Sequence, residues 1–121
     1  QVLHKKGVDY SYLDPLVGYW QLTKASVGKT VVQVKPGECL SGSVVASVLG
    51  LTIYLDYPEN GRCVKTTTNF TWKNEGGRYS GVSDSGEHVT FDMNFENNNQ
   101  TLIYRENTKN GLMTLYFNKV R

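Results

Sequence analysis

The sequence predicts an all-β protein, an eight-stranded antiparallel up-and-down (meander) β-barrel in a single domain. Its 121 residues include 12 glycines but only 3 prolines, together with eight tyrosines, a composition typical of strands joined by tight turns. Stretches of alternating apolar and polar residues recur along the chain, separated by turn signals. A chain of this length forms one sizeable hydrophobic core and not two. We therefore expect an N-terminal arm at residues 1–15 and one barrel domain at residues 16–121.

Two Asn-Gly pairs are the strongest turn signals in the chain. Asn60-Gly61 separates two strand-like stretches, and so does Asn110-Gly111. Asn and Gly both tolerate positive φ, which the two central residues of a type I′ hairpin turn require. Gly76-Gly77, Ser85-Gly86 and the Asn run at 97–99 separate the stretches between these pairs, so five consecutive hairpins are predicted.

These turn signals divide the chain into eight predicted strands. An open meander of eight strands would leave two unpaired edges, and pairing of the first strand with the last removes both. A closed barrel is therefore expected, with an interior that is either filled or wide enough for one small ligand. The expected strands are Tyr19–Ala25, Thr30–Val34, Leu51–Tyr57, Cys63–Lys73, Gly77–Val82, Glu87–Phe95, Thr101–Glu106 and Leu112–Lys119.

The segment at residues 40–49 fits two structures. Its apolar residues follow the spacing of a helical stripe, whereas the valines among them favour a strand. A short helix here would lie near the barrel mouth, and a strand would extend the sheet. The apolar residues are Leu40, Val44, Val45, Val48 and Leu49.

The opening strand carries a family resemblance. Gly18-Tyr19-Trp20, preceded by a turn-like segment and followed by a meander, resembles the signature of the lipocalin/calycin superfamily, and the chain looks most like its short bacterial-type lipocalin-like domains. The resemblance implies that Trp20 closes the base of the barrel and packs against a basic side chain from a late strand. Arg105, Lys119 and Arg121 are the candidates, since a cation over an indole face is favourable.

The apolar residues on the inward face of the predicted strands are the candidate ligand-binding residues. They would form the wall of an apolar pocket, or they would be the packed core that a barrel of this size needs. With the resemblance, they favour a protein that binds a small hydrophobic ligand. The set is Leu51, Ile53, Leu55, Phe70, Trp72, Phe91, Met93, Phe95, Leu102, Tyr104 and Tyr116, with Trp20 below it.

The alternative hypothesis is a barrel with a solid core that acts as a protein-interaction or inhibitor module. Its loops at residues 57–60 and 97–99 would contact a protein partner. The segment at residues 40–49 would add an apolar patch to this contact if it were exposed.

The two cysteines indicate an oxidising compartment. We expect a Cys39–Cys63 disulfide, and a chain that begins at Gln1 without a leader is expected to be a mature form. The protein is therefore predicted to be secreted or periplasmic, or anchored at the cell surface in its precursor. Asn69 and Asn99 begin Asn-x-Thr sequons that would accept glycans in a eukaryotic secretory pathway. No membrane-spanning segment is predicted, because the longest uncharged stretch is short and polar.

The remaining signals argue against several functions. The balance of 13 Lys and Arg against 11 Asp and Glu lacks the basic excess of a nucleic-acid-binding protein. His4 and His88 have no neighbouring set of metal ligands. The chain has no Gly-x-Ser-x-Gly motif, and its carboxylates fall at outward positions. We therefore expect no metal, no cofactor and no enzymatic activity.

Overall fold

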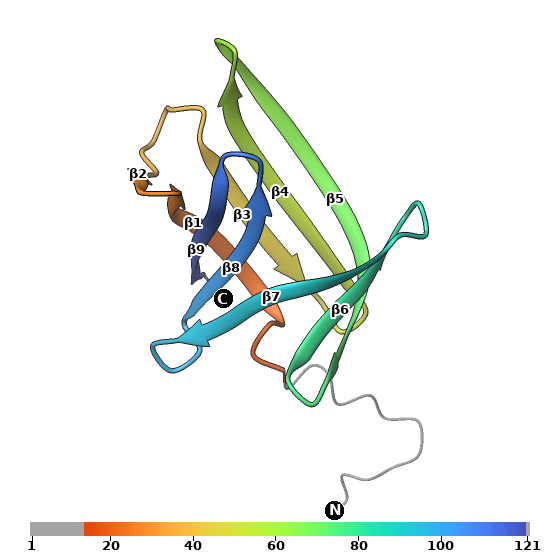
Figure 1. Cartoon of the computed structure of the whole chain (residues 1–121). Helices are drawn as coiled ribbons and strands as arrows, with labels where there is room; N and C mark the ends of the chain where they lie inside the picture. The colour runs from red at the N-terminus through yellow and green to blue at the C-terminus, as the bar shows by residue number, and fades with distance from the viewer. Residues whose placement is uncertain (1–13, 121) are drawn as a thin grey trace, which may run out of the picture.

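The computed structural model describes residues 14–120, which form nine β-strands in one antiparallel sheet (Figure 1). From β3 to β9 each strand pairs with the next one in the chain, whereas β1 pairs with β2, β3 and β9. The strands are β1 Gly18–Val27, β2 Thr30–Gln33, β3 Ser41–Ala46, β4 Gly50–Glu59, β5 Arg62–Glu75, β6 Arg78–Ser83, β7 His88–Glu96, β8 Thr101–Thr108 and β9 Gly111–Lys119.

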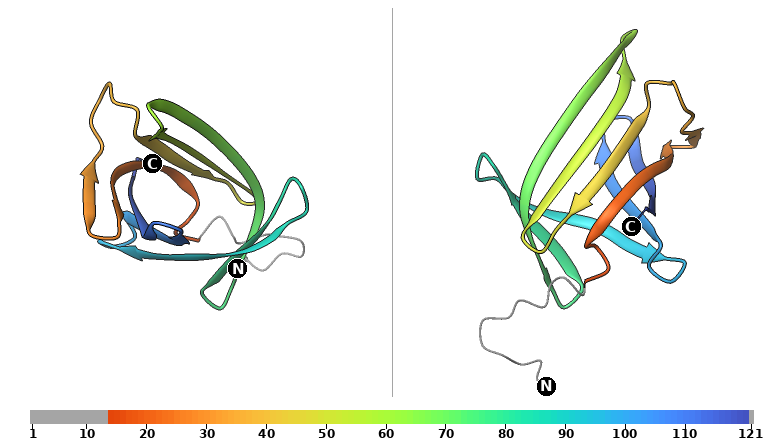
Figure 2. Two further views of the ribbon diagram at one scale, coloured as in Figure 1. Left: turned by 45° about the horizontal axis from the view of Figure 1, so that its top comes forward. Right: turned by 180° about the vertical axis from the view of Figure 1, so that it is seen from behind.

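Pairing of the first and last strands closes the sheet into a barrel. The register of β1 with β9 runs from Trp20 opposite Lys119 to Val27 opposite Met113. Strands β1 and β3 to β9 form the ring, which is visible when the molecule is tilted toward the viewer (Figure 2). The prediction of a closed eight-stranded antiparallel barrel is confirmed.

One predicted barrel strand lies outside the ring. The expected strand at 30–34 corresponds to β2, which pairs with the second half of β1, from Lys24 to Val27. The first half of β1, from Gly18 to Gln21, pairs on the same edge with β3. The segment at residues 40–49 therefore contains a barrel strand and no helix. Alternation decides this point, because Val44 and Ala46 are buried while Val45 between them is exposed.

The two Asn-Gly pairs form different turns. Asn60 and Gly61 have φ of 53° and 77°, and they connect the paired residues Glu59 and Arg62, as expected for a two-residue type I′ turn. At the second pair, Gly111 already pairs with Thr108, and of the two residues only Gly111 has positive φ, at 117°. That hairpin exists, but its turn is shifted by one residue from the prediction.

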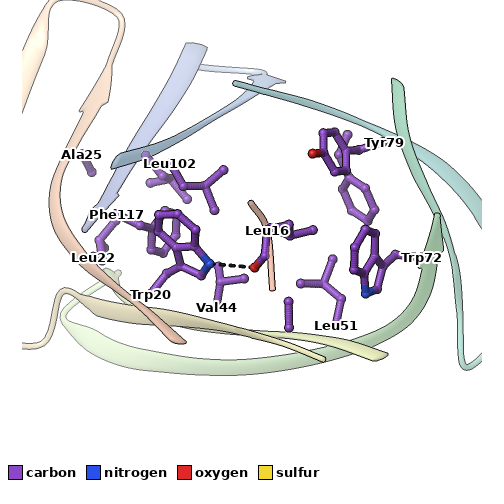
Figure 3. Close-up of a cluster of buried hydrophobic side chains, with 13 residues drawn as sticks. Leu16, Trp20, Leu22, Ala25, Val44, Leu51, Trp72, Tyr79, Leu102 and Phe117 are labelled. Carbon is purple, nitrogen blue, oxygen red and sulfur yellow. Dashed lines mark hydrogen bonds between the residues drawn. The ribbon is translucent and has the colours of Figure 1, made fainter. Parts of the chain in front are cut away.

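A cluster of buried side chains packs inside the barrel, with Trp20 and Leu16 at its base (Figure 3). Trp20 and Leu16 are fully buried, and the indole Nε1 of Trp20 donates to the carbonyl oxygen of Leu16 at 2.9 Å. In Figure 3, Leu16 lies between Trp20 and the stacked rings of Trp72 and Tyr79. The segment before β1 thus places an apolar plug at this end of the barrel.

Asp14 fixes that segment to the β5–β6 hairpin. One of its carboxylate oxygens accepts hydrogen bonds from the Leu16 amide at 2.9 Å and from the Tyr79 hydroxyl at 2.7 Å. The other accepts from the Asn74 side chain at 2.8 Å. Burial, and this carboxylate, raise the pKa of Tyr79 above its ordinary value. Of the predicted arm at 1–15, residues 1–13 lie outside the described part of the chain.

The predicted Cys39–Cys63 disulfide is present in the structure. Cys39 lies between β2 and β3, and Cys63 lies near the start of β5, beside the β4–β5 turn. This hairpin projects beyond the other strands at the top of Figure 1. The disulfide ties the projecting hairpin to the loop that joins the extra strand to the ring.

Candidate functional site

The barrel opens along its side, between β7 and β8. Residues His88 to Phe91 of β7 pair with β6, whereas Asp92 to Glu96 of β7 pair with β8. The first part of β7 therefore diverges from the last part of β8. A pocket of about 380 Å³ occupies this opening, and we call it the mouth pocket. It is lined by Phe70, Val89, Thr90, Phe91, Asp92, Tyr104, Arg105, Glu106, Asn107 and Leu112.

Aromatic rings form the apolar wall of the mouth pocket. The Phe70 and Phe91 rings meet edge to face, with centroids 5.1 Å apart and an interplanar angle of 89°, a favoured arrangement of aromatic pairs. Gly81 of β6 leaves space for Phe91, because a Cβ atom at Gly81 would come within 2.9 Å of the Phe91 ring. The glycine thereby determines how close this ring lies to β6.

Tyr104 and Glu106 form the polar element of the mouth pocket. They lie two positions apart on β8, so both face the inner side of the sheet. The Tyr104 hydroxyl donates to the Glu106 carboxylate at 2.6 Å. Burial, and then this carboxylate, raise the pKa of Tyr104 above its ordinary value. The hydroxyl therefore stays protonated and engaged as a donor to Glu106 at neutral pH.

Arg105 faces the opposite side of β8. Its guanidinium donates to the Asn94 side chain at 2.7 Å and lies 3.7 Å from the Asp92 carboxylate. It therefore lies at the outer rim of the mouth pocket and is already paired. Of the three candidates to pack against Trp20, Arg105 is therefore excluded, since alternation along β8 turns its side chain away from the interior.

At the base, Lys119 of β9 covers the indole of Trp20. Its ammonium nitrogen lies 5.2 Å from the ring centroid and 3.5 Å from the carbonyl oxygen of Pro15, to which it donates. The third candidate, Arg121, lies outside the described residues.

No protein-family model and no curated protein matches the sequence, whereas solved structures do. A lipocalin-like protein from Bacteroides uniformis matches with a TM-score of 0.54 and 16% identity over 87% of this chain and 98% of the other. The chain has a lipocalin-like fold. Lobster apocrustacyanin A1 matches with a TM-score of 0.45 and 11% identity, over 86% of this chain and 60% of that one. A mutant of the fluorescent protein UnaG matches with a TM-score of 0.44 and 9% identity, over 90% of this chain and 99% of that one.

The inward set predicted for this lipocalin-like barrel forms part of one apolar cluster that borders the mouth pocket. Leu51, Trp72, Phe91 and Leu102 are buried members of the cluster, and the partly buried residues packed against it include Ile53, Leu55, Phe70, Met93, Phe95 and Tyr104. Of these, Phe70, Phe91 and Tyr104 also line the mouth pocket. Trp20 and Phe95 are in ring contact at 5.7 Å. Most of the set thus packs against itself, and a minority borders open space.

Tyr116 was placed on the wrong face by the prediction. Its neighbours Leu115 and Phe117 are buried in the core, so Tyr116 points outward, where Lys24 lies 4.4 Å from its ring centroid. The sequence around Tyr116 is apolar at consecutive positions, so alternation gives no clear signal there. The pairing of Tyr116 with Lys24 on β1 decides the face.

Some functional residues were absent from the predicted set. Val89 follows the same alternation as Phe91 and could have been included on that ground. Glu106 was not identified because a single carboxylate near a strand end is ordinarily solvated. Asp14 could have been identified from the sequence, because an Asp commonly accepts a hydrogen bond from the backbone amide two residues on, as it does here from Leu16.

Other candidate sites can be placed on the barrel. Asn69 is exposed on the outer face of β5, where its side chain accepts from Thr52 at 2.7 Å, and Asn99 lies in the exposed β7–β8 turn with φ of 64°. Glycosylation at these positions stays a prediction. Within residues 14–120 there is no cluster of three or more metal-ligating side chains. No helix in that part of the chain is long and apolar enough to cross a membrane.

Proposed function

We propose that this lipocalin-like protein binds a small apolar molecule in the mouth pocket. The observation that carries the proposal is the contrast between the two ends of the interior. The base is filled around Trp20 and Leu16, whereas the mouth retains a pocket of about 380 Å³ against Phe70 and Phe91. This volume lies in the range of small-molecule sites, which combine apolar walls with few polar groups.

We further propose that the protein works in an oxidising compartment, as a secreted or periplasmic protein. The Cys39–Cys63 disulfide supports this location, because structural disulfides persist where thiols are not kept reduced. Mass determination of protein from its natural source, before and after reduction, tests the location through the oxidation state. Free thiols in that material would count against it.

The alternative function, a module that binds a protein through its loops, receives less support. Its apolar segment at 40–49 is not an exposed patch, because Val44 is 3% and Ala46 4% exposed. The exposed large apolar residues of that segment are Val45, at 41%, and Leu49, at 70%, and scattered exposed apolar residues are normal on protein surfaces.

A neutral apolar dye, N-phenyl-1-naphthylamine, tests the proposed function. We expect its fluorescence to rise on binding, with one dye per protein. Val89→Trp should fill the mouth pocket and weaken binding, because Val89 lines it. His88→Trp is the matched control, since the adjacent His88 is exposed and does not line this pocket.

Two results would contradict the proposal. One is the absence of saturable dye binding by folded protein, with folding checked by circular dichroism. The other is an equal loss of affinity in the Val89→Trp and His88→Trp variants, which would place the dye outside the mouth pocket.

A further inference from the structure

We infer that the mouth pocket selects an apolar molecule whose polar end is a protonated amine, and that it discriminates against carboxylates. This inference rests on the proposed function and specifies the chemical class of the ligand. It derives from the charges around the pocket and from the hydrogen bonds that those charged groups already make.

The ionised groups that line the mouth pocket are Asp92, Arg105 and Glu106. Two are carboxylates and one is a cation, so the pocket carries a net negative charge at neutral pH. Along the described residues of β8, Glu106 is the ionised side chain that shares the inner face with Tyr104. The charge nearest to a molecule inside the pocket is therefore negative.

Arg105 is not positioned to bind a carboxylate ligand. Its side chain faces outward, donates to Asn94 at 2.7 Å and lies 3.7 Å from Asp92. Both contacts use Nη1 of the guanidinium, so the outward direction of the side chain, and not a lack of donors, is what separates Arg105 from a carboxylate inside the pocket. A carboxylate in the pocket would also lie beside the exposed Glu106 carboxylate, and bringing like charges together is unfavourable.

Glu106 is able to accept a second donor. One of its oxygens accepts the Tyr104 hydroxyl at 2.6 Å, and a carboxylate has lone pairs for several hydrogen bonds. An ammonium group supplies charge-assisted donors, and these bonds are about twice as strong as neutral ones. Since Tyr104 already donates to Glu106, the pair presents acceptors rather than a donor to the ligand.

The aromatic wall favours the same class of ligand. Phe70, Phe91 and Tyr104 all line the pocket, and aromatic faces attract ammonium groups. The hydrocarbon part of such a ligand would contact Phe70, Phe91 and Val89, with its amine directed toward Glu106 at the end of β8.

Three probes with the same hydrocarbon chain test the inference: decylamine, 1-decanol and decanoate, each titrated against the bound neutral dye at neutral pH. We expect decylamine to displace the dye at a concentration about tenfold lower than decanoate, as one charge-assisted interaction allows. Glu106→Gln should weaken decylamine binding by about tenfold while changing 1-decanol by about twofold or less. Glu96→Gln is the control, because it removes the same charge from an exposed residue at the far end of β7.

The outcomes separate the two proposals. If the dye and 1-decanol bind but decylamine has no advantage over decanoate, the inference is wrong and the proposed function stands. Equal effects of Glu106→Gln and Glu96→Gln on decylamine would also overturn the inference, because the preference would then come from net charge alone. If neither the dye nor 1-decanol binds, both proposals fail together.

Discussion

Trp20 and Lys119 lie directly opposite each other where the first and last strands close the barrel. The Lys119 ammonium nitrogen is 5.2 Å from the centre of the fully buried Trp20 ring and also donates to the Pro15 carbonyl oxygen. One side chain thereby links the closing strand pair to the segment that plugs the base.

Replacement of Lys119 should destabilise the barrel. We expect Lys119→Met to lower the free energy of unfolding by about 1 kcal/mol, the usual size of a partly desolvated cation–π contact. Urea unfolding followed by tryptophan fluorescence measures this. Lys24→Met is the control, since Lys24 lies over Tyr116 on the outer face of the sheet, and it should cost less. A larger loss in the control would show that the base contact is not the stronger of the two.

Asp14 holds the plug segment in place, so its removal should cost more than that of an ordinary surface carboxylate. Asp14→Ala takes the acceptor from Leu16, Asn74 and Tyr79, and we expect a loss of about 2 kcal/mol in unfolding free energy. Asp84→Ala, which removes an exposed carboxylate 3.4 Å from the Asn69 amide, should change stability by about 0.5 kcal/mol or less. Equal midpoints in urea for the two variants would contradict the assigned role.

The disulfide should contribute strongly to stability. Cys39 and Cys63 are separated by 24 positions, and the chain-entropy model gives about 3.5 kcal/mol for a loop of this length. The double variant Cys39→Ser with Cys63→Ser should unfold at correspondingly lower urea, and reductant should shift only the wild-type curve. If the double variant were as stable as the oxidised protein, the disulfide would not stabilise the fold by restricting the unfolded chain.

Gly81 should not tolerate a side chain. A Cβ atom there would lie 2.7 Å from the Thr71 carbonyl oxygen and 2.9 Å from the Phe91 ring. We expect Gly81→Ala to destabilise the fold by about 2 kcal/mol through overpacking, and to weaken dye binding because Phe91 must move. Gly50→Ala is the matched control, with its nearest contact at 3.6 Å. Thermal unfolding and dye titration of both variants measure the difference, and equal behaviour would argue against the close packing at Gly81.

Two tyrosines should resist ionisation. The pKa values of Tyr79 and Tyr104 are raised above the ordinary value of 10.0 by burial and by hydrogen bonds to Asp14 and Glu106. The unfolded chain therefore releases these protons first, so stability is retained below about pH 10 and declines as pH rises above it. Tyrosinate absorbance during a pH titration should show Tyr79 and Tyr104 ionising after the other tyrosines. The pH at which the absorbance begins to rise should therefore be unchanged in a Tyr79→Phe, Tyr104→Phe double variant. Full ionisation of every tyrosine near the ordinary pKa would contradict this.

The sequence was sufficient to predict the barrel because its signals are local. Asn60-Gly61 and the alternation in β7 each specify a turn or a face without reference to distant residues. The prediction was wrong at β2, which was expected in the ring, and it left helix or strand open at β3. The two strands share one edge of β1, with β3 at Gly18–Gln21 and β2 at Lys24–Val27. Alternation within a segment does not specify which half of a distant strand it pairs with.

The candidate site was predictable in part for a related reason. Phe70, Phe91 and Tyr104 were identified by alternation, but alternation cannot separate a packed interior from an open one. Tyr116 was misplaced because consecutive apolar residues hide the period of its strand. Glu106 is a candidate site residue because it accepts the Tyr104 hydroxyl, and its place at the pocket depends on where β7 separates from β8.

Because β7 changes its partner from β6 to β8, the mouth pocket lies where no pairing between β7 and β8 holds the barrel together. The strands that border the mouth pocket, the first part of β7 and the last part of β8, share no ladder hydrogen bonds at the opening. Under the proposed function, a ligand would enter through this seam without breaking ladder hydrogen bonds, and the β1–β9 pairing that closes the barrel would stay in place. Under the proposed function, side chains along the seam would decide which molecule enters, and replacing them would leave the ladder hydrogen bonds of the barrel in place.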